Sequence, residues 1–187
     1  MAKINQVIND GGVVVFPTET VYGLGCDAKN EQAVARIYAL KKRDNKPLSI
    51  IVPDLATAKK YALFSPREEA LARQYWPGPL TLILKKRTGT DLADGITLGS
   101  ANIGIRIPAY PPLLDVMVET GKVLVATSVN NSGEKEYLTA AEIRHAFPSG
   151  IDYIWEDDAA LNGEASTVIY VKDEQPMVIR QGAIEIK

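Results

Sequence analysis

Short apolar runs alternate along this chain with segments in which apolar residues recur at helical spacing. Ile4, Val7 and Ile8 share one face of a helix predicted over residues 3–10, which the Gly11-Gly12 pair ends. The same spacing, with capping residues and prolines at the ends, predicts helices over residues 30–41, 54–61, 65–75, 112–120 and 139–145. Apolar runs predict buried strands over residues 13–16, 48–52, 82–84, 103–108 and 123–127.

The C-terminal third is predicted to be rich in short strands, over residues 153–155, 167–171, 177–180 and 183–186. Residues 86–100 are rich in Gly, Thr and Asp and indicate a mobile loop. Because helices and strands mix throughout and hairpin-like strands close the chain, the pattern favours an α/β fold with a twisted mixed sheet over a purely parallel one.

The stretch from Phe16 to Asp27, Phe-Pro-Thr-Glu-Thr-Val-Tyr-Gly-Leu-Gly-Cys-Asp, is predicted to be the loop between the first buried strand and the next helix. Its hydroxyl side chains can donate and accept hydrogen bonds, and its glycines allow the backbone to approach a ligand closely. The stretch is therefore a candidate cradle for a small molecule. An ordinary strand-to-helix loop is the alternative interpretation.

Polar residues follow or enter several of the buried strands: residues 17–20, Arg106, Thr127-Ser128 and Ser166-Thr167. Open α/β sheets bind ligands at the ends of their strands. If these residues converge, they form one pocket lined by hydroxyls, amides and cations, which suits an anion or a phosphate ester.

Some of these residues also have a purely structural interpretation. A half-buried Arg106 needs an anionic partner, which is either Glu19 or a substrate carboxylate. The basic run 41–43 can serve only to complement a helix dipole, and Arg180 can be solvated.

Composition excludes several classes of protein. The 187 residues suit a single domain spanning 1–187, and the net charge of −2 argues against coating nucleic acid through bulk charge. The lone Cys26 excludes an internal disulfide and is expected to be buried and inert, while the lone His145 excludes a two-histidine zinc motif and is expected at the surface. No stretch approaches the roughly 20 apolar residues that span a bilayer, so we expect no membrane contact and a cytoplasmic location.

The motifs occur in an order that resembles the YrdC/TsaC family, the threonylcarbamoyl-AMP synthases, in its short single-domain form. The resemblance rests on Pro17–Leu24, Lys41-x-Arg43 with Pro47-Leu48, Trp76–Thr81, Arg106-Ile107-Pro108, the Ser128–Gly133 turn, Ser166-Thr167-Val168 and Arg180-Gln181-Gly182. It implies a YrdC-like α/β fold, in which helices flank a twisted mixed sheet with a large positively charged cavity. It also implies condensation of L-threonine, bicarbonate and ATP into threonylcarbamoyl-AMP and pyrophosphate, for the t6A modification of tRNA at position 37.

The resemblance implies a role for each matching residue. The residues expected to bind threonine are Thr18, Arg106 and Ser166, with Arg106 on the carboxylate. The residues expected to bind ATP are Lys41, Arg43, Ser128, Asn130 and Arg180, with Lys41 and Arg43 on the triphosphate. Lys41, Arg43 and Arg106 are expected to promote the reaction through charge and positioning. No protein metal site is expected, and Mg²⁺ would be bound mainly through ATP.

Two residues depart from the family's pattern. Val129 replaces the usual alanine and is expected to add bulk beside the nucleotide, and Glu136 is expected to repel phosphate. These departures leave open an alternative, a paralogue of the same fold that binds RNA or nucleotide without this synthesis. For the synthase, we expect other t6A-pathway proteins as partners, with tRNA bound only indirectly or weakly.

Overall fold

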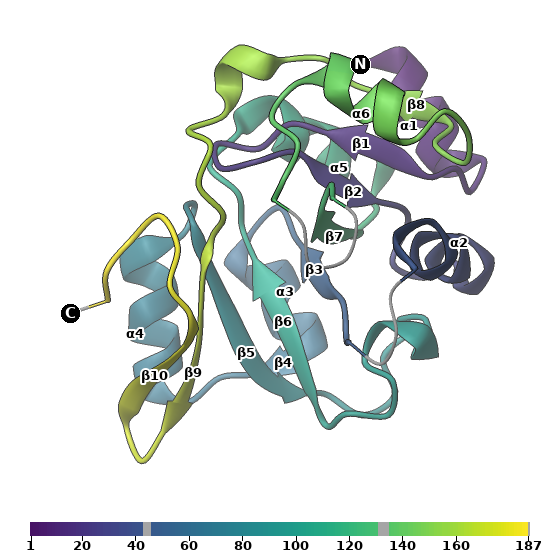
Figure 1. The fold of residues 1–187 in the computed structure, drawn as a ribbon. Coiled ribbons are helices and arrows are strands. Elements are labelled where there is room, and N and C mark those ends of the chain that lie inside the picture. The colour runs from purple at the N-terminus through teal and green to yellow at the C-terminus, as the bar shows by residue number, and fades with distance from the viewer. Residues whose placement is uncertain (43–45, 131–134, 187) are drawn as a thin grey trace.

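A ten-stranded mixed sheet runs through the part of the chain that the computed structural model describes, residues 1–42, 46–130 and 135–186 (Figure 1). The strands lie in the order β10-β9-β5-β6-β3-β7-β2-β1-β8, and β4 pairs with β5. Their bounds are β1 Val14–Phe16, β2 Gly23–Gly25, β3 Ser49–Ile51, β4 Ala62–Leu63, β5 Leu80–Lys86, β6 Asn102–Arg106, β7 Leu124–Ser128, β8 Tyr153–Ile154, β9 Thr167–Lys172 and β10 Gln175–Arg180. The sheet is strongly twisted, so that β1 and β2 run across the direction of β5 and β6 (Figure 1).

Helices cover both faces of this sheet (Figure 1). They are α1 Ala2–Asn9, α2 Glu31–Lys41, α3 Leu55–Tyr61, α4 Pro66–Tyr75, α5 Pro111–Thr120 and α6 Ala140–Ala146, with the short 3-10 helices η1 Asp94–Ile96 and η2 Asp158–Ala160. The caps expected at Asp54, Ser65 and Thr139 are confirmed, the last as a capping box with Glu142. The structure adds a cap at Asn30, which accepts the Ala33 N–H, and a capping box between Ser65 and Glu68.

The sheet separates two apolar layers, and β1 contributes to both. Val14 and Phe16 pack with α1 and α5 in the smaller cluster, while Val13 and Val15 pack in the larger one on the other face. Side chains of a strand alternate between its faces, so a strand covered on both sides consists of apolar residues throughout. This explains the unbroken apolar run at residues 13–16.

The main correction concerns the stretch from Phe16 to Asp27, which is not a simple loop. Its second half forms β2, which pairs antiparallel with both β1 and β7. The glycines of β2 make this pairing possible, because a Cβ at Gly23 would collide with the Phe16 ring and one at Gly25 with the Val125 carbonyl. Both glycines therefore serve sheet packing, and Gly23 also lines the cavity described below.

Three smaller predictions also need correction. Strand β4 was not predicted, and residues 183–186 do not form a strand although the main-chain N–H of Ala183 donates to the Ala165 carbonyl. The segment 86–100 is more ordered than its composition indicates. It contains η1, in which Ile96 is fully buried and its carbonyl accepts the Leu48 N–H.

Candidate functional site

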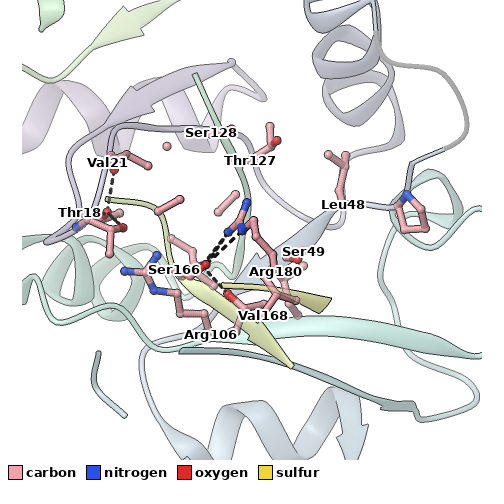
Figure 2. Close-up of a pocket in the computed structure, with 18 of the residues that line it drawn as sticks. Thr18, Val21, Leu48, Ser49, Arg106, Thr127, Ser128, Ser166, Val168 and Arg180 are labelled. Carbon is pink, nitrogen blue, oxygen red and sulfur yellow. Dashed lines mark hydrogen bonds between the residues drawn. The ribbon is translucent and has the colours of Figure 1, made fainter. Parts of the chain in front are cut away.

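A cavity of about 400 Å³ opens where β2, β3, β6 and β7 meet the β9–β10 hairpin (Figure 2). Its walls come from the loop between β1 and β2, the centre of β3, the start of β5, the ends of β6 and β7, and the 165–168 and 179–180 segments. The lining residues include the cations Lys46, Arg106 and Arg180 and, within the described chain, no aspartate or glutamate. The predicted convergence of polar strand ends is therefore confirmed.

Arg106 ends β6 and is buried, with only 8% of the residue exposed. Its Nε donates to the Gly78 carbonyl at 3.1 Å, and its Nη2 lies 2.8 Å from Oε1 of Glu19. Burial lowers the pKa of this guanidinium, and the Glu19 carboxylate opposes that shift. The buried arginine thus has the anionic partner that its position requires, and that partner comes from the chain itself.

Thr18 lines the cavity from the loop between β1 and β2, and its hydroxyl is already fully used within that loop (Figure 2). It donates to the Val21 carbonyl at 2.7 Å and accepts the Thr20 N–H at 3.1 Å. A hydroxyl has one proton, so the 2.8 Å contact between the Thr18 and Thr20 hydroxyls has Thr20 as the donor. Thr18 therefore holds the shape of this wall.

Arg180 reaches the pocket from the edge strand β10 and is anchored on Ser166 (Figure 2). Its Nε and Nη2 donate to the Ser166 carbonyl at 3.2 and 2.8 Å, and Nη2 also donates to Ser166 Oγ at 3.1 Å. Ser166 Oγ in turn lies 2.9 Å from Thr81 Oγ1. Burial lowers the pKa of Arg180, and the charge of Glu136 opposes this shift. The guanidinium is thus fixed beside the cavity.

Lys41, at the end of α2, contacts the polar turn after β7. The residue is buried, and its Nζ donates to the carbonyls of Ser128 and Asn130 at 2.5 and 3.1 Å and to Asn130 Oδ1 at 2.7 Å. Ser128 Oγ also donates to Asn130 Oδ1, at 2.9 Å. Only Ser128 of these three lines the cavity, so Lys41 and Asn130 lie behind it.

The structure therefore gathers most of the predicted site residues. Those that line one cavity are Thr18, Arg106, Ser128, Ser166 and Arg180. Arg43 lies outside the described residues. Thr81 and Lys46 line the cavity and were not predicted. The sequence did contain a signal for Thr81, which is the polar residue in the apolar run 80–84. Leu80, Leu82 and Leu84 pack in the core, so Thr81 lies on the other face of the strand.

The expectation for Val129 is wrong. Its side chain is fully buried in the larger apolar cluster and is not among the residues that line the cavity, so it adds no bulk beside a ligand there. Its N–H donates to the Tyr22 carbonyl, which points the side chain into the core. The expectation for Glu136 stays a prediction.

The expectations for the lone cysteine and the lone histidine are confirmed. Cys26 is fully buried, and burial, with a smaller effect of Asp27, raises the pKa of its thiol to about 12. His145 is exposed. Among the described residues, no group of three or more His, Cys, Asp or Glu side chains could hold a metal ion, and no helix is long and apolar enough to cross a membrane.

Comparison with known proteins places the chain in a family. The model of the Sua5, YciO and YrdC family, described as "Telomere recombination", matches residues 6–182. Two relatives named threonylcarbamoyl-AMP synthase, from Idiomarina loihiensis and Bacillus subtilis, are each 34% identical, over 180 and 186 residues. The match to the I. loihiensis relative covers 92% of this chain and 92% of that protein. The match to the B. subtilis relative covers 98% of this chain and 54% of that protein.

Solved structures agree. Pyrococcus abyssi Sua5 complexed with L-threonine has a TM-score of 0.88 at 35% identity, with 96% of this chain and 53% of that one covered. E. coli YciO has a TM-score of 0.89 at 25% identity, with 99% and 90% covered. The chain belongs to the Sua5, YciO and YrdC family, and the predicted YrdC-like fold is confirmed. It spans about half the length of the Sua5 and B. subtilis relatives.

Proposed function

We propose that this chain is a threonylcarbamoyl-AMP synthase that condenses L-threonine, bicarbonate and ATP into threonylcarbamoyl-AMP and pyrophosphate. The names of the relatives and the threonine complex of Sua5 support this over a paralogue that binds RNA or nucleotide alone. The observation on this chain that carries the proposal is the buried guanidinium of Arg106 in a cavity lined by hydroxyls, which suits the carboxylate of a small polar amino acid.

The threonine end of the pocket lies around Arg106 and Ser166. Arg106 would bind the carboxylate, and Ser166 would close the other side, where Thr81 and Arg180 orient its hydroxyl. Thr18 would contribute the wall of the loop, because its own hydroxyl is occupied.

The nucleotide end would lie toward Ser128 and Arg180. Arg180 can offer its charge to the phosphates, and Lys46 and Thr127 line the same cavity. Asn130 would act by orienting Ser128, to which it is hydrogen-bonded. Lys41 and Arg43 remain the proposed triphosphate residues, with Lys41 needing to exchange one of its present bonds to reach a phosphate.

The lining residues suit Mg²⁺ only if the ion is bound together with ATP. The described lining supplies hydroxyls and no carboxylate, so the ion would be held by phosphate oxygens, water and hydroxyls such as those of Thr127 and Ser128. When bound, it would neutralise charge on the phosphates.

The chemistry needs no protein nucleophile. The neutral amine of threonine attacks bicarbonate-derived CO2, forming the C–N bond of a carbamate and releasing its proton. The carbamate oxygen then attacks the α-phosphorus of ATP, and pyrophosphate leaves with the electron pair of the broken P–O bond. Positioning and cations that meet the charge on phosphate oxygens promote such a transfer. Threonylcarbamoyl-AMP is a reactive anhydride, which supports hand-over to other proteins of t6A synthesis, with tRNA bound only indirectly or weakly.

The test is exchange of labelled pyrophosphate into ATP by the purified protein. The proposal requires exchange that depends on both L-threonine and bicarbonate. Exchange without either substrate, or none with both, would reject it. Binding of double-stranded RNA without threonine-dependent turnover would instead support the paralogue.

A further inference from the structure

Glu19 is an unusual member of the cavity's surroundings because its carboxylate is buried without a directed hydrogen bond. Both of its carboxylate oxygens and Nη2 of Arg106 are among the buried polar atoms of the described chain that make no hydrogen bond. The two groups nevertheless form an ion pair at 2.8 Å, with side chains only 10% exposed for Arg106 and 19% for Glu19. A buried carboxylate is costly unless it is paired, so Glu19 depends on the charge of Arg106.

The burial of these atoms restricts what Glu19 can do. Solvent does not reach its oxygens, and Glu19 is not among the residues that line the cavity. A ligand in the cavity would therefore meet the opposite side of the guanidinium. Because Nε is bound to Gly78 and Nη2 is covered by Glu19, Nη1 is the nitrogen left to face that ligand.

We propose that Glu19 is the resident counter-ion of Arg106, which holds the guanidinium from behind and offsets its charge while the amino-acid site is empty. The inference rests on the proposed function only for the identity of the ligand. The Glu19 carboxylate acts through Arg106 from behind and does not touch substrate.

A second arginine makes this counter-ion necessary. The charge of Arg180 acts on Arg106 across the same cavity and disfavours its charged form. Two guanidiniums facing one cavity would repel each other and any approaching cation if neither were neutralised. Glu19 supplies one negative charge near the two arginines while the site is empty. A substrate carboxylate supplies the second negative charge when it binds.

The test compares the variant Glu19→Gln with the wild type in binding L-threonine and 3-hydroxybutyrate, which lacks the amine of threonine. Glutamine keeps the shape of the side chain and removes its charge. It therefore removes the repulsion between Glu19 and the ligand carboxylate, and 3-hydroxybutyrate should bind about tenfold more tightly. Threonine should gain by a smaller factor, because its ammonium loses an attraction. The KM for ATP should not change. Glu69→Gln, which breaks an exposed ion pair with Lys59 and Arg73, should alter neither affinity.

Either of two binding results overturns the proposal. An unchanged or lower affinity of Glu19→Gln for 3-hydroxybutyrate would show that the charge does not act on the carboxylate site. A loss of affinity confined to threonine would show that Glu19 binds the amine directly.

A double-mutant cycle tests the pair without any ligand, and so separates this inference from the proposed function. Arg106→Met alone leaves a buried carboxylate uncompensated and should lower the free energy of unfolding, measured with urea. Adding Glu19→Gln to Arg106→Met should recover part of that loss. Strict additivity of the two substitutions would contradict a counter-ion role, whether or not wild-type protein binds threonine.

Discussion

Lys41 and Asn130 are joined by two hydrogen bonds, from Nζ of the lysine to Oδ1 of the asparagine at 2.7 Å and to its carbonyl at 3.1 Å. A third bond, to the Ser128 carbonyl, engages the last of the three protons of the ammonium. The basic residue at the end of α2 therefore holds the end of β7, where Ser128 lines the cavity. This positioning effect accompanies whatever contact Lys41 makes with a bound triphosphate.

The variant Lys41→Met should lose stability as well as activity. It leaves buried acceptors on Ser128 and Asn130 without their donor, and we expect the free energy of unfolding to fall by about 1–3 kcal/mol. Threonine-dependent exchange of pyrophosphate should also fall. Chemical denaturation and the exchange assay measure the two effects. Lys60→Met, at an exposed position of α3, is the matched control. Full stability of Lys41→Met would show that the hydrogen bonds around Lys41 contribute nothing.

Arg106→Ala should abolish threonine binding and leave ATP binding in place, because its guanidinium lies at the amino-acid end of the proposed site. Isothermal titration with each ligand separately makes the comparison. The variant should also be less stable, since Glu19 loses its partner. If folded Arg106→Ala binds threonine as well as the wild type does, the arginine serves structure alone.

Tyr22→Phe tests how Tyr22, which lines the cavity, holds the segment around Asp157 and Asp158 in place. The Tyr22 hydroxyl donates to Asp158 Oδ1 at 2.6 Å and accepts the Asp157 N–H at 2.9 Å, and Asp158 Oδ1 also accepts the N–H of Ala140 at the start of α6. Loss of the hydroxyl should lower the free energy of unfolding by about 1–3 kcal/mol. It should also weaken threonine binding a few-fold, because the segment leading to Ser166 loses an anchor. Tyr170→Phe on β9 is the control. If both variants lose the same stability and the same threonine affinity, the Tyr22 hydroxyl has no special role in holding this segment.

Cys26 should resist thiol reagents in the native state. Its pKa is raised to about 12 by burial, so the thiol stays neutral and inaccessible at pH 8. In the unfolded chain the thiol ionises near its ordinary pKa of about 8.5. Above that pH the thiol ionises in the unfolded chain but not in the native protein, so ionisation favours unfolding. The stabilising contribution of the neutral Cys26 thiol is therefore complete below the unfolded pKa and declines as the pH rises toward 12. Labelling with a chromogenic disulfide should be slow in buffer and complete in guanidinium. Native labelling at the rate of a free thiol would contradict the burial.

Much of the fold follows from local pattern and was predictable. The caps at Asn30, Asp54, Ser65 and Thr139 set helix starts through bonds that span only a few residues. Strand β2 was not predictable in this way. Gly23-Leu24-Gly25 has little intrinsic strand preference, and it becomes a strand because β1 and β7 on either side provide partners.

The site was predictable in its residue types and less so in its contacts. Polar residues at strand ends indicated the cavity, and Arg106 indicated a buried anionic partner. The pairing of Arg106 with Glu19 depends on how close the loop between β1 and β2 comes to the end of β6, which no spacing in the sequence reveals. The same holds for Val129, whose direction is set by a backbone bond to Tyr22.

Incorporation of labelled bicarbonate is the most direct test of the central claim. Purified protein is incubated with ATP, L-threonine, Mg²⁺ and 13C-bicarbonate, and the products are resolved by mass spectrometry. The account predicts an AMP adduct of threonine that carries one labelled carbon, formed with an equal amount of pyrophosphate and lost in Arg106→Ala. AMP or ADP formed without a labelled threonine adduct would contradict it.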